Sequence, residues 1–151
     1  MSDSRKPRLI GINHVAIEVG DIDEALAWYG QLFDFTLRGK GERNAFIDMG
    51  DQFINLTRVP DHRVEGVERR HIGFVVDDRS TMKARAEAIG ATMVEGPFLD
   101  FLDPWGNRLE IIEYSNIQFS KAPNVMRGMG LALDKNASAK KELADKGMAA
   151  E

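Results

Sequence analysis

One segment of this chain occurs twice, and that internal duplication constrains the fold more than any other feature. The first copy reads His14-Val-Ala-Ile-Glu-Val-Gly-Asp21, and the second reads His71-Ile-Gly-Phe-Val-Val-Asp-Asp78. The likeness continues further along, because Phe46-Ile-Asp48 recurs as Phe101-Leu-Asp103. A repeat that occurs only twice indicates two paired modules rather than a solenoid.

The first copy predicts a strand, a helix and three more strands. Residues 12–19 alternate between apolar and polar, which is typical of a half-buried strand. Asp21 then stands at the position of a helix N-cap, with Glu24 three residues later and a helical apolar stripe behind it. Short strands are expected at 36–38, 45–49 and 53–58, separated by glycines.

The second copy repeats this order of elements. We expect a strand at 71–76, a helix at 80–89 and strands at 92–95, 98–102 and 108–114. Beyond residue 115 the pattern lapses, until a Lys/Glu/Ala-rich helix is expected at 137–149. The sequence therefore predicts an α+β domain over 1–115, made of βαβββ modules at about 10–59 and 70–115. Residues 116–151 form a partly helical C-terminal extension in this interpretation.

Four polar residues occupy matched places in the two modules. Asn55 and Glu110 stand at the same later position of their copies, as His14 and His71 do at the start. Strand alternation puts all four on the face opposite the aliphatic rows. If the helices cover those rows, the opposite faces curl into a cup whose floor displays the four side chains. A lone strand histidine is more often structural than a ligand, but a matched pair in phase with Glu110 favours a metal site.

Composition excludes several classes of protein. A chain of 151 residues that is 43% hydrophobic can form one ordinary globular domain. It has no cysteine, so nitrogen and oxygen atoms must bind any metal, and a cytoplasmic location fits. The net charge of −4 offers no basic surface for nucleic acid. The sequence shows neither a signal peptide nor an apolar run that could span a bilayer, so we expect no membrane association.

Several motifs together resemble those of the vicinal oxygen chelate superfamily, which includes glyoxalase I, extradiol dioxygenases and bleomycin-binding proteins. The resemblance covers roughly residues 10–115. The motifs are Asn13-His14-Val-Ala-Ile17, Asp21-Ile-Asp-Glu-Ala-Leu-Ala-Trp-Tyr29, Arg70-His71-Ile-Gly-Phe-Val-Val-Asp77 and Asp103-Pro-Trp-Gly-Asn-Arg-Leu-Glu110. The resemblance implies tandem βαβββ modules that form a curved, cup-like mixed sheet, and a homodimer.

The resemblance also assigns roles to residues of this chain. It implies metal ligands at His14, His71 and Glu110, which leave positions open for substrate on a divalent Fe, Mn, Ni, Co or Zn ion. Glu110 is a candidate for proton transfer, with Glu18 as an alternative, and Asn55 stands where glyoxalase I often carries a further carboxylate. Candidate substrate contacts are Phe53, Thr57, Arg108 and Tyr114.

The function expected from these features is that of a metal-dependent lyase or isomerase. Two oxygens of a small substrate would chelate the metal, whose Lewis acidity would stabilise a developing anion. One alternative is an Fe(II) extradiol-type dioxygenase, although Asp100 stands where that group has a tyrosine. A second alternative is a metal-free protein that sequesters a drug or metabolite. The matched triad favours an enzyme, because a binding cup has no evident need for metal ligands.

Overall fold

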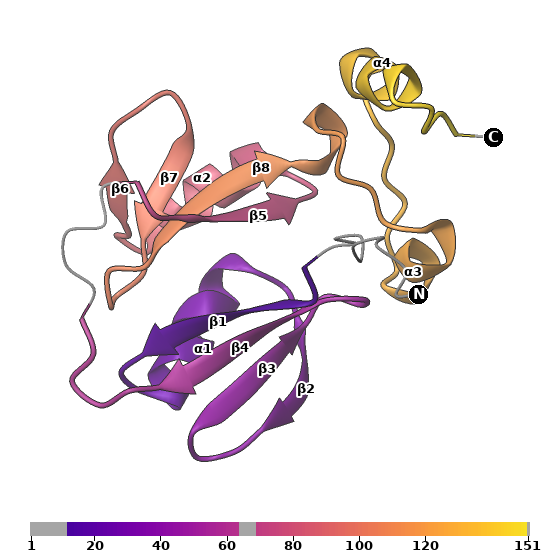
Figure 1. Ribbon diagram of the computed structural model, residues 1–151. Coiled ribbons are helices and arrows are strands. Elements are labelled where there is room, and N and C mark those ends of the chain that lie inside the picture. Colours follow the sequence, from indigo (N-terminus) through magenta and orange to yellow (C-terminus); the bar gives the residue numbers. More distant parts are fainter. Residues whose placement is uncertain (1–11, 64–68, 151) are drawn as a thin grey trace, which may run out of the picture.

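The first module has the predicted strand–helix–strand order. A computed structural model describes residues 12–63 and 69–150 (Figure 1). The elements of the first module are β1 (His14–Val19), α1 (Ile22–Leu32), β2 (Thr36–Lys40), β3 (Asn44–Asp48) and β4 (Phe53–Arg58). They form a four-stranded sheet in the order β1-β4-β3-β2. β1 runs parallel to β4, and the remaining neighbours are antiparallel.

The second module repeats this topology. Its elements are β5 (Ile72–Val76), α2 (Arg79–Ala88), β6 (Thr92–Val94), β7 (Leu99–Leu102) and β8 (Arg108–Glu113). The sheet order is β5-β8-β7-β6, with β5 parallel to β8. The predicted α+β fold of two βαβββ modules is therefore confirmed.

An aspartate begins each of the two main helices. The Asp21 carboxylate accepts the backbone N–H of Glu24 at 2.9 Å, and the Asp78 carboxylate accepts that of Thr81 at 2.9 Å. Asp78 also accepts the hydroxyls of Ser80 and Thr81. These hydrogen bonds to its charged form lower the pKa of Asp78 to about 2. Each aspartate satisfies backbone donors that the first helical turn leaves open.

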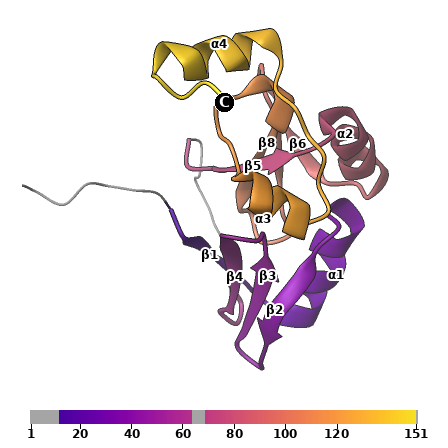
Figure 2. The ribbon, with the colours of Figure 1, turned by 90° about the vertical axis from the view of Figure 1, so that its right-hand side faces the viewer.

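Both helices lie on the same side of the two sheets (Figure 2). The aliphatic rows of the strands face them, and one apolar core joins the two modules. Its most deeply buried side chains are Ile17, Val19, Tyr29, Leu56, Phe101, Leu109 and Ile111. Along β1, His14, Ala16 and Glu18 alternate with this row and are exposed. The opposite faces of the sheets are therefore free to carry polar chemistry.

The modules contact each other through α1 and α2, and β1 and β5 run in opposite directions along the facing edges of the two sheets (Figure 1). These two strands belong to separate sheets. Side chains of the β7–β8 turn hold the modules together instead. Buried Asp103 accepts the hydroxyl of Tyr29 at 3.0 Å, and the side-chain amide of Asn107 donates to the backbone oxygen of Glu18 at 3.0 Å. Burial raises the pKa of Asp103, although its hydrogen bonds oppose that rise.

The C-terminal extension crosses from the second module to the first. It contains a 3-10 turn η1 (Tyr114–Asn116), α3 (Pro123–Gly128) and α4 (Ala137–Asp145). The sequence did not predict α3, and α4 is shorter than the predicted helix because Gly147 adopts a left-handed φ of 72°. α3 packs on the β3–β4 turn at Gly50. Within the described residues, no helix has the length and apolar character needed to cross a membrane.

Candidate functional site

His71 and Glu110 lie next to each other on the sheet face opposite α2. His71 immediately precedes β5, and Glu110 is in the paired strand β8, opposite Gly73. The imidazole Nε2 of His71 is 3.2 Å from Oε2 of Glu110, and their side chains are 43% and 18% exposed. The other ring nitrogen, Nδ1, is 2.7 Å from the backbone oxygen of Arg69. We refer to these two side chains as the His71/Glu110 pair.

The hydrogen bond to Arg69 fixes what the His71/Glu110 pair can bind. A carbonyl oxygen only accepts, so Nδ1 must carry the hydrogen, and the lone pair of a neutral ring is then on Nε2. That lone pair faces a carboxylate oxygen, so two electron-rich atoms require a cation between them. A proton on Nε2 satisfies them, and so does a metal ion. Ligand atoms about 2.1 Å from one metal and at right angles lie about 3 Å apart, which fits the observed separation.

His14 is held in the same way in the first module. Its Nδ1 is 2.8 Å from the side-chain oxygen of Asn13, which leaves Nε2 available. The ring stacks on Phe53, with centroids 4.6 Å apart and an interplanar angle of 10°. Phe53 is the register partner of His14 on β4. The two histidines thus share an anchored Nδ1, and Nε2 of His71 faces Glu110 whereas Nε2 of His14 has no partner among the described residues.

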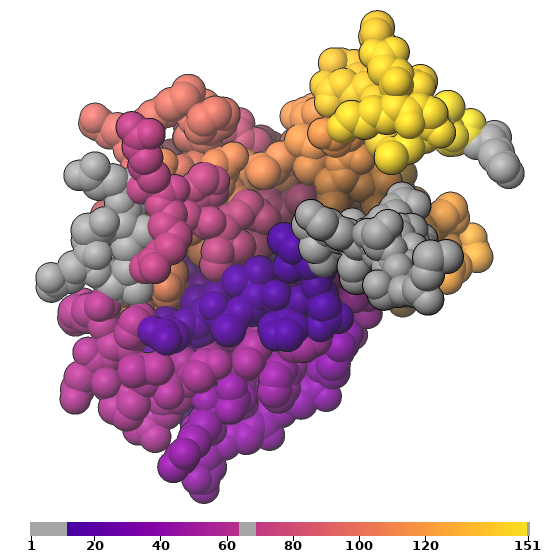
Figure 3. Space-filling view, viewed as in Figure 1, coloured from indigo at the N-terminus to yellow at the C-terminus, as the bar shows by residue number. Residues whose placement is uncertain are grey.

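The three predicted ligands do not gather within one chain. Among residues 12–63 and 69–150, no group of three or more His, Asp or Glu side chains could hold a metal ion. The structure brings His71 and Glu110 together and leaves His14 apart on the other sheet. The atoms of β1 lie open at the surface along the boundary between the modules (Figure 3). His14 is an exposed residue of β1, so a second molecule can reach it.

Asn55 and Thr57 are joined to a third residue of their own sheet. The side-chain amide of Asn44 donates to Oδ1 of Asn55 at 2.9 Å and is 3.2 Å from the hydroxyl of Thr57. Asn55 is half-buried on β4, opposite Ala16 of β1. Its carbonyl oxygen is already engaged, and a neutral amide is no general base. Asn55 can orient a bound molecule through its remaining N–H groups.

Arg108 and Tyr114 also make contacts within the protein. The guanidinium of Arg108 forms an ion pair with Asp100 of β7, which is buried, and its Nε donates to Asp100 at 2.7 Å. Tyr114 is buried in η1, and Nζ of Lys135 lies 3.4 Å from the centre of its ring. The backbone oxygens of Tyr114 and Phe119 accept from the same ammonium. Lys135 therefore fixes the start of the extension beside Tyr114.

His62 has a structural contact that the sequence interpretation missed. Its side chain is 14% exposed, and its Nδ1 is 3.3 Å from a carboxylate oxygen of Glu18. Asp61 adopts a left-handed φ of 58°, and the backbone N–H of His62 donates to Val59. That turn folds the chain back onto β1. The residue types gave no signal for it.

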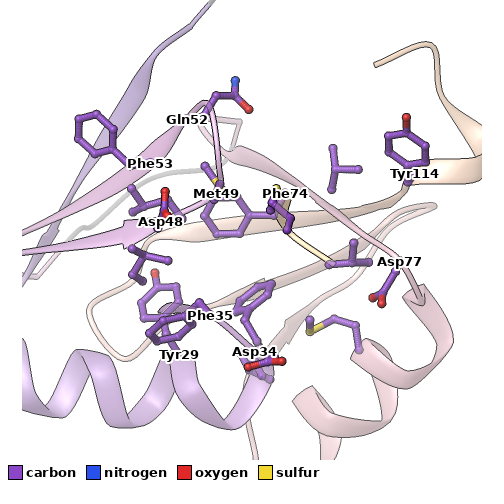
Figure 4. A pocket seen from close by; sticks show the side chains of 18 of the residues that line it. Tyr29, Asp34, Phe35, Asp48, Met49, Gln52, Phe53, Phe74, Asp77 and Tyr114 are labelled. Carbon is purple, nitrogen blue, oxygen red and sulfur yellow. The ribbon is translucent and has the colours of Figure 1, made fainter. Parts of the chain in front are cut away.

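A cleft lies between the modules and has a volume of about 790 Å³. His14, Phe53 and Tyr114 line it, together with Phe35, Phe74 and other apolar side chains (Figure 4). His71, Glu110, Asn55, Thr57 and Arg108 are not in its lining. The cleft and the His71/Glu110 pair are therefore separate features of the chain.

The chain was compared with known protein families and proteins. The sequence profile of the Glyoxalase/Bleomycin resistance protein/Dioxygenase superfamily matches residues 11–111. A glutathione transferase FosA from Serratia marcescens is 26% identical over 113 residues, which cover 68% of this chain and 80% of that protein.

Solved structures share the fold at lower sequence identity. A lactoylglutathione lyase from Agrobacterium tumefaciens is 24% identical to this chain, with a TM-score of 0.54. The match covers 71% of this chain and 96% of the lyase chain. A fosfomycin resistance protein FosX from Listeria monocytogenes is 17% identical to this chain, with a TM-score of 0.59. The match covers 69% of this chain and 92% of the FosX chain. That FosX variant was solved with Mn(II) and 1S,2S-dihydroxypropylphosphonic acid.

Proposed function

Since the chain belongs to the Glyoxalase/Bleomycin resistance protein/Dioxygenase superfamily, we propose that it is a divalent-metal-dependent enzyme acting on a small oxygenated substrate. The observation that carries the proposal is the His71/Glu110 pair, in which an anchored imidazole turns Nε2 toward a carboxylate oxygen 3.2 Å away. This donor set fits a borderline divalent ion such as Mn, Fe, Co, Ni or Zn. Mn(II) in the FosX structure supports the same choice.

The third ligand comes from a second copy of the chain in this proposal. His14 is exposed, has a free Nε2 and lies on the sheet face opposite the helices, as the His71/Glu110 pair does. A symmetric homodimer that packs these faces together places His14 of one copy against His71 and Glu110 of the other. Two equivalent sites result, each with two imidazoles and one carboxylate. The bound ion would supply Lewis acidity to two neighbouring oxygens of the substrate.

Group transfer is the reaction type that the site favours. The carboxylate next to Glu110 is that of Asp100, which is buried in an ion pair with Arg108, and Asn55 cannot act as a base. Glu18 is four residues from His14 along β1, which is about 13 Å at the usual rise of a strand. A thiol that adds to carbon while a carbon–oxygen bond breaks can give its own proton to the freed oxygen. The similarity to a glutathione transferase FosA supports this choice.

A lyase or isomerase reaction is the second candidate, in which Glu110 would move a proton. Ring cleavage by dioxygen is less favoured. At the position where an extradiol dioxygenase has a tyrosine, Asp100 is buried in an ion pair with Arg108. Asp100 therefore cannot face a substrate. A metal-free binding protein is less favoured, because a binding cup has no evident need for the matched residues His14, His71 and Glu110.

Metal titration tests the ligand assignment. The protein is purified without chelators and titrated with Mn²⁺, and we expect one tight site per chain. His14→Ala and His71→Ala should each abolish tight binding without unfolding the domain, because the apolar core does not include either ring. His62→Ala is the matched control and should retain the metal. Full occupancy in both His14→Ala and His71→Ala would refute the assignment.

Product analysis then tests the reaction type. The manganese-loaded protein is mixed with thiols and small oxygenated electrophiles, with hemithioacetals, and with catechols under oxygen. We expect a thiol conjugate by mass spectrometry, and we expect Glu110→Ala to abolish it. Hemithioacetal rearrangement without conjugate formation would favour the second candidate instead.

A further inference from the structure

The two ends of the boundary between the modules differ, although the modules are equivalent. At one end the β7–β8 turn places Trp105 between the modules, where it is buried. Its indole Nε1 lies 2.6 Å from the point that a Cβ on Gly20 would occupy. Gly20 precedes the N-cap of α1, so the ring closes the boundary against the start of that helix. The tryptophan leaves no room for a ligand there.

The equivalent turn at the other end has Gly50 at the position that Trp105 occupies in the β7–β8 turn. Asp48 corresponds to Asp103 in the repeat, and the turn after it carries Gly50 with a left-handed φ of 85°. Met129 and Val125 of the C-terminal extension approach this glycine instead, 2.8 and 3.0 Å from an added Cβ. The extension therefore covers the end that the turn leaves open. Between them remains the cleft of about 790 Å³.

The body of this cleft is apolar. Its lining includes Phe33, Phe35, Phe74, Met82, Met126 and Leu131. These side chains come from both modules and from the extension, so the cleft is specific to this chain's arrangement of parts. A volume of several hundred Å³ with an apolar lining is typical of sites for small organic molecules.

Carboxylates outnumber cationic side chains in the lining of the cleft. Asp34 and Asp77 are exposed, and no hydrogen bond or ion pair is recorded for either carboxylate within the described part of the chain. Figure 4 shows both among the side chains around the cleft, with Phe35 and Phe74. Of the cationic side chains in the lining, Lys121 pairs with Asp51, whereas Arg85 donates to the neutral backbone oxygen of Gln31 and keeps its positive charge.

The remaining carboxylates of the lining are also engaged. Asp48 pairs with Arg38 at 3.0 Å, and Asp78 caps α2. An apolar cavity whose carboxylates outnumber its cationic side chains is complementary to a molecule with an apolar body and one positive charge. We propose that this cleft binds a lipophilic organic cation, with Asp34 and Asp77 facing its charged group. Of the proposed metal ligands, His14 lines this cleft, and His71 and Glu110 do not.

A pair of probes that differ only in head-group charge tests this proposal. Decyltrimethylammonium and decyl sulfate are titrated into the full-length protein below their micelle-forming concentrations, with heat as the readout. We expect the cation to bind at least tenfold more tightly than the sulfate. Shortening the cation from ten to eight carbons should weaken binding roughly tenfold, because the chain is buried. Equal affinity for both head groups, or no binding of the cation, would overturn the proposal.

Two variants locate the site. Asp34→Asn combined with Asp77→Asn should weaken the affinity for decyltrimethylammonium at least tenfold. Glu42→Gln combined with Glu142→Gln removes the same amount of charge elsewhere and should leave that affinity unchanged. Leu131→Trp should weaken binding by filling the cleft. The two asparagine changes are on exposed side chains and leave the core intact. Unchanged affinity in that variant would place the cation elsewhere and refute the assignment.

Discussion

Gly20→Ala is predicted to destabilise the protein through one contact. An added Cβ would lie 2.6 Å from Nε1 of Trp105, whereas non-bonded heavy atoms prefer about 3.5 Å or more. Overpacking of this kind costs about 1–3 kcal/mol. Replacing glycine also lowers the conformational entropy of the unfolded chain, which raises the free energy of unfolding by about 0.4–1 kcal/mol. We expect a net loss of about 1–2 kcal/mol in the free energy of unfolding, or a Tm lowered by about 2–8 °C.

A double-mutant cycle shows whether that contact is the cause. In a Trp105→Leu background the indole is absent, so Gly20→Ala should cost little or nothing, and the coupling energy should be about 1–2 kcal/mol. Gly30→Ala is the control, since no atom lies within 4 Å of its added Cβ and the residue is in α1. That change should stabilise the protein. Urea unfolding measures all four variants. An equal cost of Gly20→Ala in both backgrounds would refute the reasoning.

Three further predictions address the caps, the buried hydrogen bond and Asn55. The pKa of Asp78 falls from 3.8 to about 2 on folding, so its contribution to stability is present above pH 3.8 and is lost as the pH approaches 2. Asp78→Ala should therefore make the urea midpoint depend less on pH between 3.8 and 2. An unchanged dependence on pH in this variant would argue against the cap. Tyr29→Phe removes the hydroxyl that donates to buried Asp103 and should cost about 1–2 kcal/mol by thermal unfolding, whereas a neutral result would mean that water replaces the donor. Asn55→Glu should suppress turnover in the presence of Mn²⁺ by occupying an open position, and a gain of hemithioacetal isomerisation at constant metal content would contradict the favoured reaction type.

The fold could be predicted from the sequence because its signals are local. Alternation along residues 14–19 and 72–76 identifies the first strand of each module, and Asp21 and Asp78 begin the helices as expected. The repeat then doubles the evidence for each element. Local patterns of this kind depend on short stretches of chain, which the sequence displays directly.

Features that depend on distant contacts could not be predicted in the same way. α3 has only six residues, none of them buried, and it packs on Gly50. The sequence therefore has no apolar stripe from which this helix could be predicted. The burial of His62 depends on the turn at Asp61. The faces of His14 and His71 follow from strand alternation, but the distance between them depends on how the modules pack. The proposed meeting of His14 with Glu110 requires a second chain, which the sequence suggests only through family resemblance.

Mixing two defective variants tests the shared metal site most directly. His14→Ala lacks one proposed ligand, and a chain with His71→Ala and Glu110→Ala lacks the other two, so neither homodimer can assemble a full site. In a heterodimer, His14 of the second chain meets His71 and Glu110 of the first, and one of the two sites is complete. The variants are unfolded together, refolded at equal concentration and analysed for bound Mn²⁺. We predict that metal binding returns to about a quarter of the wild-type level, because random pairing makes half of the dimers mixed. No recovery in a sample that contains heterodimers would contradict a site built from two chains.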